Sequence, residues 1–356
     1  MVIFDLDGTL WNSSANVAAS WNVVIEQELG KPNALTGADI LQYMGLTMTE
    51  IADLHFGFLP PEQRYDLSHK CEVFENGYIT EHGGRLFEGV EENLKKLKDM
   101  GVGYVGISLD GCEATHDKFR GKEGAYKLAL RGIRNCVATG QKVGLRFTIT
   151  RYNVQDLNAI FDLLEAENID RVCFYHLVYS GRGSAMVQND LNHEESRKAM
   201  DLIIDRTLDF KKRGIDKEIL TVDNHADAVY LYLRMKREDP ARAEKVLELI
   251  QRNGGNRSGM AFGNIDSIGN VHPDQFTQYI TLGNVRERSF GDIWSDESNP
   301  IMAGLKNRKP ILKGRCPKCA YLNLCNGNFR TRAEAVTGDF WEQDPACYLT
   351  DEEVGL

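Results

Sequence analysis

The chain has 356 residues, which is enough for two or three domains that each bury a hydrophobic core. Its contents of 42% hydrophobic and 26% charged residues are typical of a soluble globular protein. No apolar run reaches the roughly eighteen residues that a membrane-spanning helix needs, and the start, MVIFDLDGTL, lacks the basic region of a signal peptide. We therefore expect a cytoplasmic protein with no membrane partner. The net charge of −10 also argues against a nucleic-acid partner.

The first hundred residues begin with a strand pattern and continue with helical patterns. Residues 2–6 (VIFDL) form an apolar run that stops at Asp7-Gly8, as a strand that enters a tight loop does. Residues 13–82 have a mostly helical pattern, and a further helix ends at Gly101, which is suited to a C-cap.

Strands and helices alternate in the middle of the chain, which is typical of parallel βα units in a sheet or a partial barrel. The expected strands cover residues 102–111, 142–150, 170–178 and 218–222, and the expected helices cover about 122–138, 154–166, 193–213 and 226–252. The pattern changes at Gly254-Gly255, where short strands (260–266 and 269–273), turns and closely spaced cysteines follow. We place a domain boundary there.

Four of the eight cysteines are close together near the C-terminus, at Cys316, Cys319, Cys325 and Cys347. A C-x-x-C turn directs two thiolates to one side of a metal, and the later cysteines can complete the ligand set. In a reducing compartment such a group indicates a metal site and not disulfides. Zinc and a four-iron cluster both satisfy this spacing. The other cysteines are isolated and expected to be buried or half-buried hydrophobic residues: Cys71, Cys112, Cys136 and Cys173.

The segment Asp5-x-Asp7-Gly8-Thr9 at the end of an apolar strand resembles the first motif of the haloacid-dehalogenase superfamily of phosphatases. The chemistry needs two carboxylates that hold different protonation states in one site. The resemblance implies that Asp5 is the nucleophile and a Mg²⁺ ligand, and that Asp7 is the acid/base. Residues 13–82 then correspond to the helical cap of that family.

The phosphatase family also needs a downstream lysine and an acidic pair that completes the Mg²⁺ site. A Gly-Asp-x-x-x-Asp pattern occurs at 291–296 (GDIWSD), but the preceding VRERSF is too polar for a buried strand. We therefore interpret 291–296 as a turn into a helix. A Mg²⁺-dependent phosphatase remains an alternative reading with an incomplete site.

Four segments of the middle part resemble radical S-adenosylmethionine (SAM) enzymes that carry a SPASM-type C-terminal domain: GISLDG (106–111), THDKFRGKEGAYKLALRGI (115–133), RFTIT (146–150) and FYHLVYSGRG (174–183). The strand ends of that family line the cavity for SAM, and βα folds generally place ligands there. The resemblance implies that Ser108, Asp110, Arg146 and His176 contact SAM or the substrate. Asp110-Gly111 could instead be a strand-ending turn and Arg146 a surface residue.

The last hundred residues resemble haem d1 biosynthesis enzymes of the radical SAM group, which are relatives of haem-forming decarboxylases, through GNIDSIGNVHPDQF (263–276), TLGNVRERSFGDIW (281–294) and DPAC (344–347). The resemblance implies a tetrapyrrole substrate, an electron donor protein and one auxiliary 4Fe–4S cluster on the four clustered cysteines. A second auxiliary cluster is not expected, because His272-Pro-Asp274 and Asn328 stand where further cysteines are usual. His272 is either a hydrogen-bonded turn histidine, or a ligand or tetrapyrrole contact.

The sequence lacks the C-x-x-x-C-x-x-C motif that holds the SAM-cleaving cluster in this family. We predict an α/β chain with three parts: a phosphatase-like strand and cap over 1–101, a partial parallel βα sheet or half-barrel over 102–253, and an iron–sulfur domain over 254–356. Three functions stay open: a radical SAM/SPASM protein of haem biosynthesis, a phosphatase, or a fused chain that retains only the auxiliary cluster.

Overall fold

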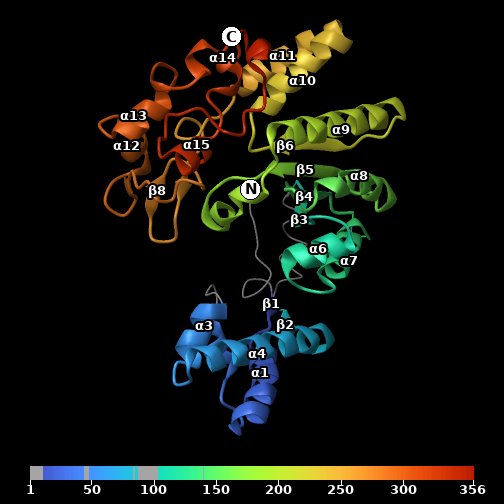
Figure 1. Ribbon diagram of the computed structural model, residues 1–356, viewed down its shortest axis with the longest axis vertical. Helices are drawn as coiled ribbons and strands as arrows, with labels where there is room; N and C mark the ends of the chain where they lie inside the picture. Colours follow the sequence, from blue (N-terminus) through green and yellow to red (C-terminus); the bar gives the residue numbers. More distant parts are fainter. Residues whose placement is uncertain (1–10, 44–47, 83–84, 87–102, 139) are drawn as a thin grey trace. The chain divides into compact units, whose positions relative to one another are not determined.

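The computed structural model describes residues 11–43, 48–82, 85–86, 103–138 and 140–356 (Figure 1). The chain forms two compact units, Met1–Gly103 and Tyr104–Leu356. The predicted strand over 2–6, with Asp5 and Asp7, and the predicted helix before Gly101 lie outside the described residues.

The first unit is helical, as the pattern over 13–82 predicts. A short strand, β1 (Trp11–Asn12), pairs antiparallel with β2 (Arg85–Leu86). The helices bury a core in which the Trp21 and Phe56 rings stack with centroids 6.2 Å apart. Cys71 is fully buried in the same core, as expected for an isolated cysteine. The helices are α1 (Ser14–Leu29), α2 (Gly37–Gln42), α3 (Met48–His55) and α4 (Pro61–His82).

A four-stranded parallel sheet forms the centre of the second unit, with the strand order β3-β4-β5-β6. The strands are β3 (Val105–Ser108), β4 (Val143–Ile149), β5 (Arg171–His176) and β6 (Glu218–Val222). Each strand lies within a predicted range. The connecting helices are α6 (Glu113–Arg120), α7 (Ala125–Ala138), α8 (Leu157–Ala166), α9 (His193–Lys212), α10 (Ala226–Glu238) and α11 (Pro240–Asn253), with 3₁₀ turns η1 (Val154–Asp156) and η2 (Gly181–Asn189).

One predicted helix, over 226–252, is two helices in the structure. Proline cannot donate a backbone hydrogen bond, and it forces the preceding residue out of the α region. Pro240 therefore ends α10 at Glu238 and begins α11, whose N-terminus is capped by the Asp239 side chain through the Arg242 amide at 3.1 Å.

The sheet and the C-terminal region share one hydrophobic core. Phe147, Phe161 and Phe174 are fully buried at its centre, and Leu324 and Tyr348 from the cysteine-rich region belong to the same core. Because these side chains pack together, the loops that carry the clustered cysteines are held against the sheet and its helices.

The C-terminal region consists of short elements, as predicted after Gly254-Gly255. A three-stranded antiparallel sheet contains β7 (Asn264–Ile265), β8 (Asn270–His272) and β9 (Gly283–Asn284). The segment 291–296, predicted to be a turn into a helix, lies in α12 up to Ser295, and Asp296 is the C-cap. Ser289 caps the start of this helix by accepting the Asp292 amide at 3.1 Å. The remaining elements are α12 (Phe290–Ser295), α13 (Pro300–Lys306), η3 (Lys309–Ile311), η4 (Cys316–Lys318), α14 (Leu322–Cys325), α15 (Arg330–Thr337) and α16 (Asp351–Val354).

Candidate metal centre

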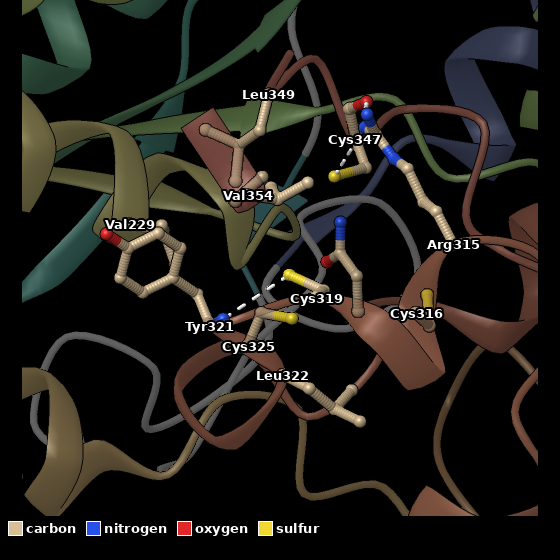
Figure 2. Close-up of a pocket in the computed structure, with 12 residues that line it drawn as sticks. Val229, Arg315, Cys316, Cys319, Tyr321, Leu322, Cys325, Cys347, Leu349 and Val354 are labelled. Carbon is tan, nitrogen blue, oxygen red and sulfur yellow. Dashed lines mark hydrogen bonds between the residues drawn. The ribbon is translucent and has the colours of Figure 1, made fainter. Parts of the chain in front are cut away.

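The four clustered cysteines line one pocket in the second unit. Cys316 begins the 3₁₀ turn η4, Cys319 follows it, Cys325 ends α14, and Cys347 lies in the segment between α15 and α16. Figure 2 shows Cys347 on the opposite side of the pocket from Cys325 and Cys319. The other lining residues are mostly apolar and come from α10, α14 and the last turns of the chain: Ala226, Val229, Tyr321, Leu322, Leu349 and Val354, with Arg315 and Asn328.

The local sequence explains how the first three cysteines converge. The proline in Cys316-Pro-Lys-Cys319 favours the tight turn, which the Cys319 amide closes by donating to the Cys316 carbonyl at 3.1 Å. After Cys325 the chain reverses through three consecutive left-handed residues, with φ of 52°, 79° and 58° at Asn326, Gly327 and Asn328. Asparagine and glycine are the residues that adopt this conformation most readily.

The predicted boundary at Gly254-Gly255 packs directly against this turn. A Cβ atom on Gly255 would lie 2.3 Å from the carbonyl carbon of Cys325, and the φ of Gly255 is +69°. The next amide, of Asn256, donates to the Cys325 carbonyl at 3.1 Å. Only glycine permits both the conformation and the close approach, so this position helps to place Cys325.

Several N–H groups point at the cysteine sulfurs. The Tyr321 amide lies 3.4 Å from the Cys319 sulfur, and Arg315 Nη2 lies 3.3 Å from the Cys347 sulfur and donates to the Cys347 carbonyl at 2.8 Å (Figure 2). Backbone amides also bond Cys325 and Cys347. Hydrogen bonds to ligand sulfurs are among the features that tune iron–sulfur clusters.

Burial opposes the formation of free thiolates in this pocket. It raises the pKa of Cys316 to about 11 and that of Cys325 to about 12, and it raises the pKa of Cys347 as well. A metal that binds thiolates must therefore offset this desolvation through its own positive charge.

The two metal centres that satisfy the cysteine spacing need different arrangements of their ligands. Among the described residues, no three or more His, Cys, Asp or Glu side chains converge closely enough to hold one metal ion. A tetrahedral zinc needs all four sulfurs at about 2.3 Å from one centre, whereas a four-iron cluster takes one cysteine on each iron and so spreads its ligands around a larger volume. All four cysteines line one apolar pocket.

The strand ends form a second group of polar side chains. Ser108 is exposed and in register with Arg146 on β4, whose guanidinium lies over the Tyr175 ring at 5.0 Å from its centroid. Asp110 is buried, pairs with Arg120 and accepts the Thr148 amide at 3.1 Å. The Asp110 carboxylate therefore already organises the turn after β3, and a cofactor would have to share it.

His176 belongs to a buried hydrogen-bonded network at the end of β5. Its Nε2 lies 2.9 Å from Asp227 Oδ2, and the Tyr348 hydroxyl donates to Asp227 Oδ1 at 2.7 Å. Burial alone would lower the pKa of His176, but the charge of Asp227 raises it above its ordinary value. The pKa of Asp227 is lowered in spite of its burial, because His176 and the hydrogen bonds stabilise the carboxylate.

Sequence reasoning missed Asp223, the residue directly after β6. Asp223 has a left-handed φ of 68°, and burial raises its pKa to about 6. The sequence does contain a signal for Asp223, because an acidic residue directly after an apolar strand is the pattern that also singled out Asp110. Asp227 and Tyr348 gave no comparable signal.

The other predictions for single residues have the following outcomes. His272 is a buried turn histidine whose Nδ1 lies 2.9 Å from the Ile280 carbonyl oxygen. Of the isolated cysteines, Cys173 is buried, and Cys112 and Cys136 are half-buried. No helix within the described residues is long and apolar enough to span a membrane.

Comparison with known proteins identifies the class. A family model for the iron–sulfur cluster-binding SPASM domain matches residues 260–320, and one for the haloacid dehalogenase-like hydrolases matches residues 2–110. The solved structure of anSMEcpe with bound AdoMet shares the fold, with a TM-score of 0.53, 14% identity and coverage of 96% of this chain and 85% of that chain. The second unit thus contains a SPASM-type iron–sulfur domain, and the chain shares the fold of the anSMEcpe structure.

The relatives narrow the class to haem biosynthesis. Fe-coproporphyrin III synthase of Methanosarcina barkeri is 57% identical over 74% of this chain and 67% of its own length. Pre-heme d1 synthase of Dinoroseobacter shibae is 44% identical over 73% of this chain and 65% of its own length. The chain belongs to this family of radical SAM haem-biosynthesis proteins. It spans about two thirds of the length of these relatives.

The two similarities overlap along the chain. A match over 74% of the chain is longer than the second unit, so it begins before Tyr104. The hydrolase match extends to residue 110, which is after β3. The phosphatase-like and haem-synthase-like parts therefore share the segment around the junction.

The pH dependence of stability tests the His176–Asp227 pair. We expect His176→Gln, which keeps a hydrogen bond but removes the charge, to lose roughly 1.5–3 kcal/mol of unfolding free energy near pH 5 to 6. Because the folded pKa of His176 is raised, its contribution is complete below its unfolded pKa of about 6.5 and is lost as the pH rises through the folded value.

The measurement is anaerobic denaturation of wild type and His176→Gln between pH 5 and 9. The stability difference should be largest at the acidic end and narrow towards pH 9. A difference that stays constant over this range would contradict a charged His176 in the folded protein.

Proposed function

We propose that the second unit holds one auxiliary [4Fe–4S] cluster on Cys316, Cys319, Cys325 and Cys347, and that it binds a tetrapyrrole. The observation that supports the cluster site is that all four cysteines line one apolar pocket with N–H groups at their sulfurs. The cluster supplies one-electron redox chemistry when bound, which would need an electron donor.

The tetrapyrrole assignment follows from the relatives whose names specify haem-type products. Arg146 is a suitable contact for a carboxylate of a tetrapyrrole or of SAM. It lies on β4 next to the end of β3, and its guanidinium forms no ion pair with any carboxylate of the described residues. Guanidinium groups bind carboxylates in a bidentate, charge-assisted way.

We further propose that this chain does not generate a radical from SAM by itself. Its 356 residues contain no C-x-x-x-C-x-x-C motif, so three thiolates that would leave one iron open to SAM are missing. SAM or substrate could still occupy the strand ends near Ser108, Asp110, Arg146 and His176. Binding and radical formation are therefore separable in this protein.

Iron analysis tests the cluster assignment. After anaerobic reconstitution we expect about four irons per chain and an electron paramagnetic resonance spectrum of the reduced protein that SAM does not change, because all four irons have cysteine ligands. Cys325→Ser should lose most of the iron. Cys173→Ser, a buried cysteine outside the pocket, is the matched control and should keep it.

Two other results would change the proposal. About eight irons, or a spectrum that shifts with SAM, would mean that the isolated cysteines build a second cluster. Full iron content in Cys325→Ser would remove Cys325 from the ligand set.

A binding titration tests the tetrapyrrole assignment. We expect iron coproporphyrin, followed by its visible absorption, to bind wild type and to bind Arg146→Ala on the order of tenfold more weakly, because one charge-assisted contact is lost. Arg171→Ala is the control, since Arg171 also stacks on a tyrosine, Tyr104, but lies at the start of β5 and pairs with Glu218 at 2.8 Å. Equal affinities for all three proteins would exclude Arg146 as a contact.

The hydrolase match over 2–110 justifies a test of the phosphatase alternative. The acids of the 291–296 pattern are already used, because Asp292 accepts the Ser289 hydroxyl at 2.7 Å and Asp296 pairs with Arg288 at 2.9 Å. With Mg²⁺ and p-nitrophenyl phosphate we expect wild type and Asp5→Asn to have the same background turnover. A Mg²⁺-dependent activity that Asp5→Asn abolishes would establish the phosphatase instead.

A further inference from the structure

Two arginines near the cysteine pocket are buried, and neither forms an ion pair with the described residues. Arg308 is 2% exposed, and Arg330 is 3% exposed. No carboxylate of the described residues lies within 4.0 Å of either guanidinium, whereas Arg332, which is equally buried, pairs with Asp344 at 2.7 Å. Arg308 and Arg330 therefore differ from Arg332, a buried arginine of the same region that has a carboxylate partner.

The hydrogen bonds of Arg308 all go to neutral groups. Its Nη1 donates to Asn256 Oδ1 at 2.9 Å, its Nη2 to the Ser258 carbonyl at 2.6 Å, and its Nε to the Leu305 carbonyl at 3.2 Å. A longer contact of 3.5 Å reaches the Asn326 carbonyl, directly after Cys325.

Arg330 is bound in the same way. It donates to the carbonyls of Phe340, Glu342 and Gly327, and its Nε–H is buried without any partner. Arg308, the N-cap of η3, and Arg330, the first residue of α15, thus both reach the left-handed turn after Cys325.

A buried charge that has only neutral partners is strongly unfavourable, and proteins normally avoid it. Desolvation lowers the pKa of Arg308 to about 10 and also lowers that of Arg330, as expected for charges that lack compensation. Asp274 raises the pKa of Arg308 and Asp344 raises that of Arg330, but neither carboxylate comes within 4.0 Å of these guanidiniums. Negative charge at Cys325 raises the pKa of both arginines, and negative charge at Cys316 also raises that of Arg330. An anion in the cysteine pocket would therefore add to the compensation that the two distant carboxylates provide.

We infer that Arg308 and Arg330 are the buried counter-charges of the proposed cluster and that they raise its reduction potential. The inference rests on the proposed cluster site. A four-iron cluster with four thiolates has a net charge of about −2 when oxidised and about −3 when reduced. Two fixed positive charges in a low-dielectric interior stabilise the reduced form more than the oxidised form.

The test separates charge from shape by comparing four variants of the reconstituted full chain. Arg308→Gln and Arg330→Gln remove the charge, whereas Arg308→Lys and Arg330→Lys keep it. Midpoint potentials are measured by anaerobic redox titration followed by electron paramagnetic resonance, with iron and sulfide determined for each sample. Arg171→Gln, which removes a charge at the start of β5, is the control.

We expect both glutamine variants to have more negative midpoint potentials than wild type, and both lysine variants and Arg171→Gln to remain near it. Glutamine variants with full iron content and an unchanged potential would overturn the inference. Equal shifts in the glutamine and lysine variants would also overturn it, because the guanidinium hydrogen bonds and not the charge would then be responsible.

If both glutamine variants lose the cluster, no midpoint potential can be measured for them. The rate at which each variant loses iron to a chelator is then compared instead. Lysine variants that retain iron as long as wild type would support the counter-charge role, and lysine variants that lose it as fast as the glutamine variants would refute it. A wild-type chain that takes up no iron refutes the proposed cluster site itself. The two failures are therefore distinguishable.

Discussion

The buried ion pair between Arg332 and Asp344 is the interaction on which the arrangement of the second unit depends. Arg332 is fully buried, pairs with Asp344 at 2.7 Å and donates to the Leu177 carbonyl beyond β5 at 3.2 Å. The Asp344 carboxylate also accepts the amides of Phe329 and Ala346, both at 2.9 Å. Breaking such a pair leaves an uncompensated buried charge, so it fixes the turn before Cys347 against the sheet.

A second polar link joins the same two regions. Asp227, at the start of α10, accepts from the Tyr348 hydroxyl and pairs with His176 at the end of β5. Since Tyr348 follows Cys347, the strand end and the last cysteine of the group are connected through one carboxylate. The strand-end residues and the cysteine pocket are therefore parts of one packed unit, and a substrate at the strand ends would lie on the same scaffold as the proposed cluster.

The sequence predicted the periodic and motif-bearing features well. The four parallel strands lie inside their predicted ranges because alternating apolar runs between helices leave little freedom of assignment. The cysteine spacing identified the pocket because a C-x-x-C turn is local. The break at Pro240 was missed because the apolar periodicity continues across it. The roles of Arg308 and Arg330 could not be predicted, because both residues depend on burial by segments distant in sequence.

Binding of an auxiliary cluster and cleavage of SAM make different demands on the protein, and the buried charges bear on the first. Around the cysteine pocket lie two buried guanidiniums, Arg308 and Arg330, that form no ion pair with the described residues. N–H groups also point at the sulfurs of Cys319 and Cys347. These groups are unfavourable without an anionic centre and favourable with one. Cleavage of SAM needs a different ligand set, which the chain does not contain. The proposed cluster site and the cleavage of SAM thus depend on different sets of residues.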